Sequence, residues 1–338
     1  MVTIKDISKQ SGFSVATVSK VLNNYPDISK ATRDIVLKAC NEMGYIPNLS
    51  ARSLKTHRSH TIGIIFEEIT NQGLQHPLFA KILESFKSLV ESRGYDIMFL
   101  AKRMGKLDGS YLQHAKRKQV DGVLVLCEDF NSVDMLELYD SNMPLVLIDF
   151  NVSNGITITS NNEDAMNQGV QYLKSIGHKH IAHIYGDPST YIGNIRKLAF
   201  EKTVEDSGLP LNTSFLVSGE YFSKEDGYRA MKKLLKLSVQ PTAIFCASDL
   251  LAIGAIQAIK ETGKTVPNDY SIIGFDGIDL GQMITPRLTT IRQDARKMGE
   301  IAARKVMQLI DNRETSVVGE TITVDTFLIT GESTRVLH

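Results

Sequence analysis

From residue 61 onward, short apolar runs alternate with longer amphipathic stretches, and this alternation is the strongest constraint on the fold. Residues 62–66 and 145–148 consist of Ile, Leu, Val, Phe and one Gly, without the polar alternation of a half-exposed strand. Strands that are apolar on both sides need cover on both faces, which parallel sheets flanked by helices provide. The pattern occurs twice in succession, so we expect an α/β core of two doubly wound parallel-sheet lobes. Ligands of such lobes bind beyond the carboxyl ends of the strands.

The spacing of apolar residues predicts where the strands and helices lie. In the first half, strands are expected at 62–66, 96–100, 120–126 and 144–149, and helices at 79–93, 111–119 and 135–140. In the second half, strands are expected at 180–186, 214–218, 242–246, 271–276 and 320–328, and helices at 164–176, 196–207, 224–237, 250–262 and 298–311.

A short helix with small and polar residues is predicted at 15–23, and the Ser14 hydroxyl is a suitable N-cap for it. At 3.6 residues per turn, Val18, Val21 and Leu22 share one face. The opposite face carries Val15, Ala16, Ser19, Lys20 and Asn23. Small side chains let a helix backbone approach a flat partner, and the floor of the DNA major groove is such a partner.

The segment around this helix has the pattern of a helix-turn-helix motif. One helix is expected from a Thr3 cap to Gln10, before a tight turn at Ser11-Gly12, and a third is expected from a Ser29 cap to Gly44. In helix-turn-helix proteins the second helix reads the bases. A plain helical hairpin can contain the same glycine turn, so the pattern by itself leaves both interpretations open.

Positive charge is concentrated in the N-terminal segment, although the whole chain carries 38 Lys and Arg against 38 Asp and Glu. Residues 1–60 contain nine Lys and Arg and four Asp and Glu, a balance of +5, which leaves −5 for the remainder. A basic head on an acidic body fits a head that meets phosphates.

Several short motifs of this head occur together in one order and spacing. They are Thr3-Ile4-Lys5-Asp6-Ile7, Thr17-Val18-Ser19, Thr32-Arg33, Gly44-Tyr45-Ile46-Pro47-Asn48 and Ala51-Arg52-Ser53-Leu54. With these motifs the segment closely resembles the N-terminal domain of the lac/galactose repressor family. The resemblance implies an all-α helix-turn-helix DNA-binding domain at 1–47, followed by a hinge helix and linker at 48–60.

The resemblance also implies which residues contact DNA. They are Thr3, Ser14, Val15, Ala16, Ser19, Lys20, Asn23, Tyr45, Asn48, Ala51, Leu54 and Lys55. In related repressors the hinges of two subunits enter the minor groove together, and a leucine wedges between bases and kinks the duplex. Leu54 matches that leucine. Lys20 stands where the family usually has arginine, so a point charge replaces a two-pronged reader of guanine.

The rest of the chain resembles the sugar-binding core of the same family, which is similar to periplasmic binding proteins. The matching motifs are Val120-Asp121-Gly122, Ile176-Gly177-His178, Arg196 to Phe200, Ser248-Asp249, Gly274-Phe275-Asp276 and Leu288-Thr289-Thr290-Ile291. The resemblance implies a two-lobed effector-binding and dimerisation core at 61–338, in which the chain crosses between the lobes three times. The first lobe is expected at about 61–155 and 291–318, and the second at about 156–290 and 319–338.

Six residues at predicted strand ends or helix starts are candidates for effector binding: Phe79, Arg196, Phe222, Ser248, Asp276 and Gln293. For Arg196, Phe222, Ser248 and Gln293 the resemblance to the family implies this role. A sugar ring needs an apolar surface, which Phe79 and Phe222 could supply, although aromatic residues equally serve as core. Arg196, at the expected start of a helix, could donate two hydrogen bonds. Asp276, after a buried strand, could accept from two hydroxyls. A surface cation and a local backbone cap are the alternative roles for these two charged residues.

Two departures from the family pattern affect the expected pocket. Residues 72–76, from Gln72 to His76, look inserted beside Phe79, so the mouth of the pocket is expected to be unusual. Asn161 stands where a carboxylate is common in the family, which weakens any role there in accepting hydroxyls.

The sequence predicts a DNA-binding transcriptional regulator, and the resemblance implies a repressor that binds a palindromic operator as a homodimer. Its effector is expected to be a sugar or sugar derivative. A phosphorylated carrier protein is the alternative effector, and a sugar-binding protein without a DNA role is the alternative class.

Other classes of protein lack support in the sequence. We find no P-loop, dinucleotide-binding glycine motif, Gly-x-Ser-x-Gly or metal-ligand cluster, so no enzyme activity, cofactor or metal is expected. The chain also has no long apolar span and no signal-peptide-like start, so we expect a cytoplasmic protein without a membrane segment.

Overall fold

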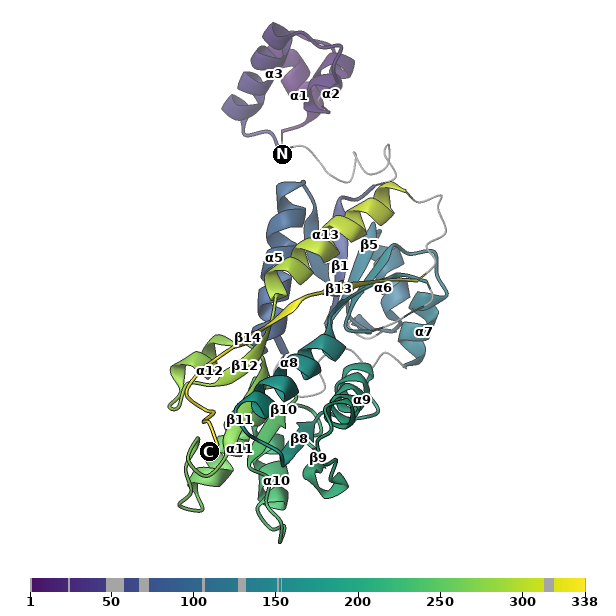
Figure 1. The fold of residues 1–338 in the computed structure, drawn as a ribbon. Helices are drawn as coiled ribbons and strands as arrows, with labels where there is room; N and C mark the ends of the chain where they lie inside the picture. Colours follow the sequence, from purple (N-terminus) through teal and green to yellow (C-terminus); the bar gives the residue numbers. More distant parts are fainter. Residues whose placement is uncertain are drawn as a thin grey trace. The chain divides into compact units, whose positions relative to one another are not determined.

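The computed structural model describes residues 2–23, 25–46, 58–66, 73–104, 107–126, 132–150, 152, 154–312 and 319–337. These residues form two compact units, Met1–Ser59 and His60–His338, drawn in Figure 1. The hinge helix expected after residue 47, with Asn48, Ala51, Leu54 and Lys55, lies outside the described residues. Among the described helices, none combines the length and the apolar character that crossing a membrane requires.

The first unit contains the helices α1 (Ile4–Ser11), α2 (Val15–Leu22) and α3 (Lys30–Met43). Gly12 makes the turn between α1 and α2 with φ 74°, a left-handed conformation that glycine adopts without strain. Ser14 then caps α2, because its Oγ accepts from the backbone N–H of Thr17 at 3.1 Å. Val18 and Val21 are buried in the core of this unit. The expected cap and inward face of the second helix are therefore confirmed.

The second unit contains two six-stranded sheets. The strands of the first are β1 Thr61–Phe66, β2 Asp96–Phe99, β5 Gly122–Leu126, β6 Leu145–Ile148, β7 Ile156–Ser160 and β13 Glu320–Val324. They lie in the order β13-β7-β6-β5-β1-β2, with all neighbours parallel. Helices α5 (Pro77–Ser92) and α13 (Ala295–Asp311), side by side in Figure 1, cover one face. Helices α6 (Tyr111–Lys118) and α7 (Val133–Tyr139) cover the other face.

The second sheet has the same construction. Its strands are β8 Ile181–Tyr185, β9 Leu216–Ser218, β10 Ala243–Cys246, β11 Ser271–Asp276, β12 Thr289–Gln293 and β14 Thr326–Ile329. Their order is β14-β12-β11-β10-β8-β9, and the pairing of β12 with β14 is antiparallel. Helices α8 (Asn162–Ser175) and α9 (Tyr191–Asp206) cover one face. Helices α10 (Lys224–Leu234) and α11 (Asp249–Lys260) cover the other face.

Smaller elements complete the described structure. They are the two-stranded ribbon β3 Arg103–Met104 with β4 Leu107–Asp108, the helix α12 Asp279–Met283, and the 3-10 turns Gly73–Gln75 and Thr213–Phe215. The first of these turns lies within the segment that looks inserted, immediately before α5.

The structure corrects the lobe boundaries expected from the sequence. Those boundaries place 156–160 and 319–324 in the second lobe, whereas β7 and β13 belong to the first sheet. Strand β7 pairs with β6 and β13, with Ile156 opposite Val146 and Glu320. The expected last strand, 320–328, is in fact two strands in different sheets, and β12 continues to residue 293 before the chain leaves the second lobe. Periodicity identifies a strand but not its partner, because strand pairing depends on residues far away in the sequence.

One buried histidine in the second sheet has an incomplete set of partners. His183 of β8 is fully buried, and its Nδ1 lies 2.7 Å from the carbonyl oxygen of Phe245. Its ring stacks on Phe200 with centroids 4.5 Å apart. Its Nε2 has no hydrogen-bond partner within the described residues. Burial lowers the pKa of His183 to about 4.

We expect His183→Leu to gain stability relative to the parent protein as the pH falls from 7 to 5. In the parent, His183 takes up a proton near pH 6.5 in the unfolded chain but only near pH 4 in the folded protein. Because the unfolded state then binds more protons, the free energy of unfolding decreases as the pH falls. The leucine variant has no such loss. Urea unfolding at several pH values should show the difference in unfolding free energy growing by up to about 1.4 kcal/mol per pH unit. A difference that does not change with pH would contradict this assignment.

Candidate functional site

The outer face of α2 presents a small, mostly uncharged surface to solvent. Ser14, Val15, Ala16 and Lys20 are exposed, and Val15 retains 41 % of its surface. Ser19 and Asn23 are half-buried. The Nδ2 of Asn23 donates to the backbone carbonyl of Ser19 at 2.8 Å, so this amide is turned back onto the helix. The arrangement leaves the N-terminal half of α2 open to a flat partner, and Lys20 in the last turn is the cation of this surface.

Two other candidate DNA contacts lie near the ends of the described head. Thr3 is exposed, and its Oγ1 donates to the Asp6 carboxylate at 2.7 Å. Tyr45 packs partly against the core of the head, and burial raises the pKa of its hydroxyl. Both residues therefore have structural roles: Thr3 begins α1, and Tyr45 closes the core behind α3.

In the second unit, polar side chains converge where the strands end. We call Asp149, Ser160, Asn162, Arg196, Asp276 and Gln293 the strand-end cluster. Asp149 follows β6, Ser160 ends β7, Asp276 ends β11 and Gln293 ends β12; Asn162 begins α8, and Arg196 comes from α9. The cluster lies where open α/β sheets bind ligands.

Arg196 lies inside this cluster and not at the start of a helix as expected. Thr190 caps α9, so the helix begins at Tyr191 and Arg196 is in its second turn. The guanidinium is buried, and it donates from Nε to Asn162 at 2.8 Å and from Nη1 to the carbonyl of Ala247 at 2.8 Å. The alternative role as a surface cation is therefore wrong.

The same guanidinium has aromatic and acidic neighbours at the end of β11. It lies 3.7 Å from the centroid of the Phe275 ring. Its Nη1 is 3.9 Å from Oδ1 of Asp276. The guanidinium therefore packs on the Phe275 ring and lies beside the Asp276 carboxylate at the strand ends.

Asp276 and Gln293 are joined by a hydrogen bond. The Nε2 of Gln293 donates to Asp276 Oδ1 at 2.7 Å, and its Oε1 accepts from Ser160 Oγ at 2.6 Å. Gln293 thus links the end of β7 in the first sheet to the end of β11 in the second sheet. Asp276 has φ 106°, a left-handed conformation that an aspartate adopts only under constraint. Burial raises the pKa of its carboxyl to about 7, although Arg196 opposes the increase.

Two aspartates of this region were missed by the sequence reasoning. Asp149 accepts from Thr159 Oγ1 at 2.8 Å, and burial raises its pKa while the Arg196 charge opposes this. Asp249 accepts from Thr290 Oγ1 at 2.6 Å and from the Ile278 amide at 2.8 Å. Burial and then the neighbouring Asp276 raise its pKa. Both follow buried strands, so the criterion that selected Asp276 also selects them.

Phe222 and Ser248 lie together on the side of the second sheet that α10 and α11 cover. Ser248 caps α11 by accepting from the Leu251 amide at 3.1 Å, and its Oγ lies 3.4 Å from the carbonyl of Phe222. Phe222 packs over Gly186, where a Cβ would lie 1.9 Å from its ring. Gly186 is therefore required for the ring to lie across the end of β8.

Phe79, the other candidate aromatic residue, packs within the first lobe. Its ring meets Phe66 at the end of β1, with centroids 6.0 Å apart, and His76 at 4.7 Å. His76 belongs to the segment that looks inserted and directly precedes α5. Phe79 therefore lies near a strand end, as expected, and its ring contacts within the described residues are with Phe66 and His76.

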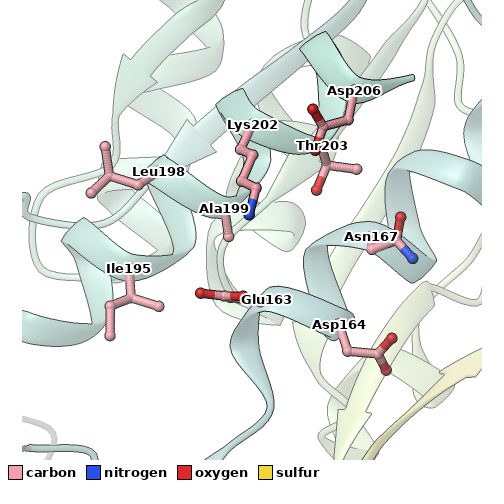
Figure 2. Close-up of a pocket in the computed structure, with 9 residues that line it drawn as sticks. All are labelled: Glu163, Asp164, Asn167, Ile195, Leu198, Ala199, Lys202, Thr203 and Asp206. Carbon is pink, nitrogen blue, oxygen red and sulfur yellow. The ribbon is translucent and has the colours of Figure 1, made fainter. Parts of the chain in front are cut away.

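A separate groove runs between α8 and α9 and is drawn in Figure 2. It is lined by Glu163, Asp164, Asn167, Ile195, Leu198, Ala199, Lys202, Thr203 and Asp206. None of the six candidate effector residues lines it. Arg196 is buried next to Ile195 in the sequence but points away from this groove toward Asn162 and Ala247.

The fold and these two sites define a DNA-binding regulator with a sensor core. A small helical head presents an open recognition helix, and a two-lobed core gathers buried charges at its strand ends. The family described as "Bacterial regulatory proteins, lacI family" matches residues 3–48, and the "Periplasmic binding protein-like domain" matches residues 170–334.

Similarity to known repressors extends over nearly the whole chain. The HTH-type transcriptional repressor PurR of Haemophilus influenzae is 35% identical over 321 residues, which are 94% of each chain. The Lac repressor dimer bound to operator and the anti-inducer ONPF has a TM-score of 0.81, with 26% identity over 99% of both chains. The transcriptional regulator CelR in complex with cellobiose has a TM-score of 0.70, with 25% identity over 98% of this chain and 100% of CelR. The chain belongs to the lacI family of bacterial regulatory proteins and is a transcriptional regulator.

Proposed function

We propose that this regulator represses transcription by binding a palindromic operator as a homodimer, and that a sugar or sugar derivative bound at the strand-end cluster controls its operator affinity. The observation that carries the effector proposal is the pairing of buried Arg196 with Asp276 at the strand ends. A guanidinium and a carboxylate together can donate to and accept from the hydroxyls of one ligand. The cellobiose held by CelR supports a carbohydrate.

A phosphorylated carrier protein is the second candidate effector. Its docking would need free cations on the surface, and α5 and α13 carry Lys81, Arg296 and Arg304 on the sides of a shared groove. Arg296 Nε lies 3.0 Å from Glu300 Oε1, and Arg304 Nη2 lies 3.7 Å from Glu300 Oε2. Lys81 Nζ lies 2.8 Å from Asp279 Oδ1, so each of the three cations already has a carboxylate partner. We therefore favour the small molecule.

We expect the full-length protein to select an inverted repeat from a random DNA library. One recognition helix reads only a half-site, so two subunits are needed for specificity. Sedimentation velocity at micromolar concentration should give a dimer, and the complex with the selected duplex should contain two chains. A monomer bound singly to a non-repeated site would refute the proposal.

The effector is identified by thermal melting of the same full-length protein with sugars and sugar acids. A ligand that raises the melting temperature is then added to the complex with the selected duplex. The proposal requires that such a ligand changes operator affinity. By linkage, the duplex must change ligand affinity by the same factor.

A further inference from the structure

The cation of the recognition helix is held by a carboxylate from the next loop. Lys20 Nζ lies 2.6 Å from Asp27 Oδ2, and both side chains are about half exposed, 48% and 53%. The pairing raises the pKa of Lys20 and lowers that of Asp27. The contact spans seven residues and is not the helical spacing of a routine surface pair.

The loop between α2 and α3 holds Asp27 in this position. The backbone N–H of Tyr25 donates to the Lys20 carbonyl at 3.1 Å, and the Tyr25 carbonyl accepts from Arg33 Nη2 of α3 at 3.0 Å. Pro26 then restricts the backbone immediately before Asp27. The backbone two residues before Asp27 is therefore anchored to the main chain of α2 and to the Arg33 side chain of α3.

We propose that Asp27 is a specificity-determining residue, which withholds Lys20 from phosphates in complexes with non-cognate DNA and releases it to a base edge at the operator. The inference rests on the proposed DNA-reading role of Lys20. Asp27 acts through Lys20 and is not itself proposed to contact DNA.

The physical basis is competition among three partners for one ammonium group. Non-specific binding comes almost entirely from Lys and Arg that neutralise phosphates and release counterions. A lysine that stays paired with a carboxylate neutralises no phosphate, so it displaces no counterion from the DNA. An exposed ion pair favours the paired state by less than about fivefold. A base-edge contact discriminates by about five- to 150-fold, so the cognate base edge at the operator displaces Asp27.

The head provides a matched control for the charge change. Lys38 and Glu42 form a second lysine–carboxylate pair, at 3.8 Å along α3. Glu42→Gln alters the net charge of the head as much as Asp27→Asn does. It frees a lysine on a different helix from the one that reads bases.

The experiment measures DNA affinity between 50 and 200 mM salt for full-length parent, Asp27→Asn, Asp27→Ala, Glu42→Gln, Lys20→Ala and Lys20→Ala/Asp27→Asn. The probes are a duplex selected by the parent protein and a mixed-sequence duplex of the same length. On mixed-sequence DNA, both Asp27 variants should bind several-fold tighter, with a salt slope steeper by about 0.9 per subunit. The gain on the selected duplex should be smaller. The double variant should lose the extra slope, and Glu42→Gln should not acquire it.

Other outcomes identify which idea fails. If Asp27→Asn and Glu42→Gln change DNA affinity and salt slope equally, the net charge of the head explains both results and the inference is overturned. Weaker binding of Asp27→Asn to the selected duplex would mean that Asp27 contacts DNA directly, which also overturns it. If Lys20→Ala keeps the parent's preference for the selected duplex, the DNA-reading role of Lys20 fails and the inference fails with it.

Discussion

Arg196→Ala is expected to lower the free energy of unfolding of the second unit by about 3–5 kcal/mol, because removing one partner of a buried ion pair leaves an uncompensated charge. The truncation would also leave Asn162 and the carbonyl of Ala247 without their donor. It would remove the cation that lies 3.7 Å from the Phe275 ring centroid. The sequence alone suggested an arginine at a helix start that donates hydrogen bonds to a ligand. The structure instead makes Arg196 part of the core as well.

Urea unfolding of the full-length variant, followed by a signal from the second unit, measures this loss. Lys197→Ala is the matched control, since Lys197 is the next residue of α9 and pairs with Glu201 at 2.8 Å in helical spacing. Exposed pairs of this spacing contribute about 0.3–0.5 kcal/mol, and we expect the partly exposed Lys197 pair to contribute less than the buried Arg196. Similar losses for the two variants would show that burial of Arg196 has little energetic consequence and would contradict the assignment.

Effector affinity is expected to rise with pH up to about 7 and then to level off, because Asp276 has a pKa of about 7 in the free protein. Ligand hydroxyls donate to the ionised carboxylate, so binding releases a proton wherever the group is protonated beforehand. Below pH 7 the affinity should fall by up to about tenfold per pH unit. The stability of the fold without effector depends on pH in the opposite direction from effector affinity. The raised pKa stabilises the fold below pH 4, and this contribution is lost as the pH rises through 7.

Asp276→Asn should abolish the pH dependence and weaken effector binding at pH 8 by about 1.5–3 kcal/mol, the range for hydrogen bonds to charged groups. Isothermal titration calorimetry in buffers of different ionisation enthalpy measures both the affinity and the proton release. Asp206→Asn serves as the control, because Asp206 is an exposed aspartate at the end of α9 in the separate groove. An unchanged affinity and pH profile in Asp276→Asn would remove this residue from the effector site.

The candidate site was only partly predictable. Arg196, Asp276 and Gln293 were selected as separate strand-end or helix-start residues, and the structure joins them by contacts and one hydrogen bond. Asn162, which binds the guanidinium, gave no sequence signal beyond its place before a helix. The partners of a buried charge come from other elements, so they cannot be read from spacing along one element.

The recognition helix shows the same division. Its Ser14 cap and its buried Val18 and Val21 follow from local spacing, because a cap and an amphipathic face involve residues within one or two turns. The Lys20–Asp27 contact depends instead on the path of the following loop, which Arg33 holds from another helix. The helix was predictable from the sequence, whereas the pairing of Lys20 with Asp27 was not.

The sequence by itself determined the class of fold, since apolar strands that alternate with amphipathic helices can be buried only as covered parallel sheets. It also determined most strands and helices to within a few residues. Only the tertiary structure decided which sheet each strand joins, and therefore that the chain crosses between lobes at Asn161, Asp294 and Asp325. The reason is physical: periodicity records which side of an element is buried, whereas pairing and charge placement depend on contacts between residues that are distant along the chain.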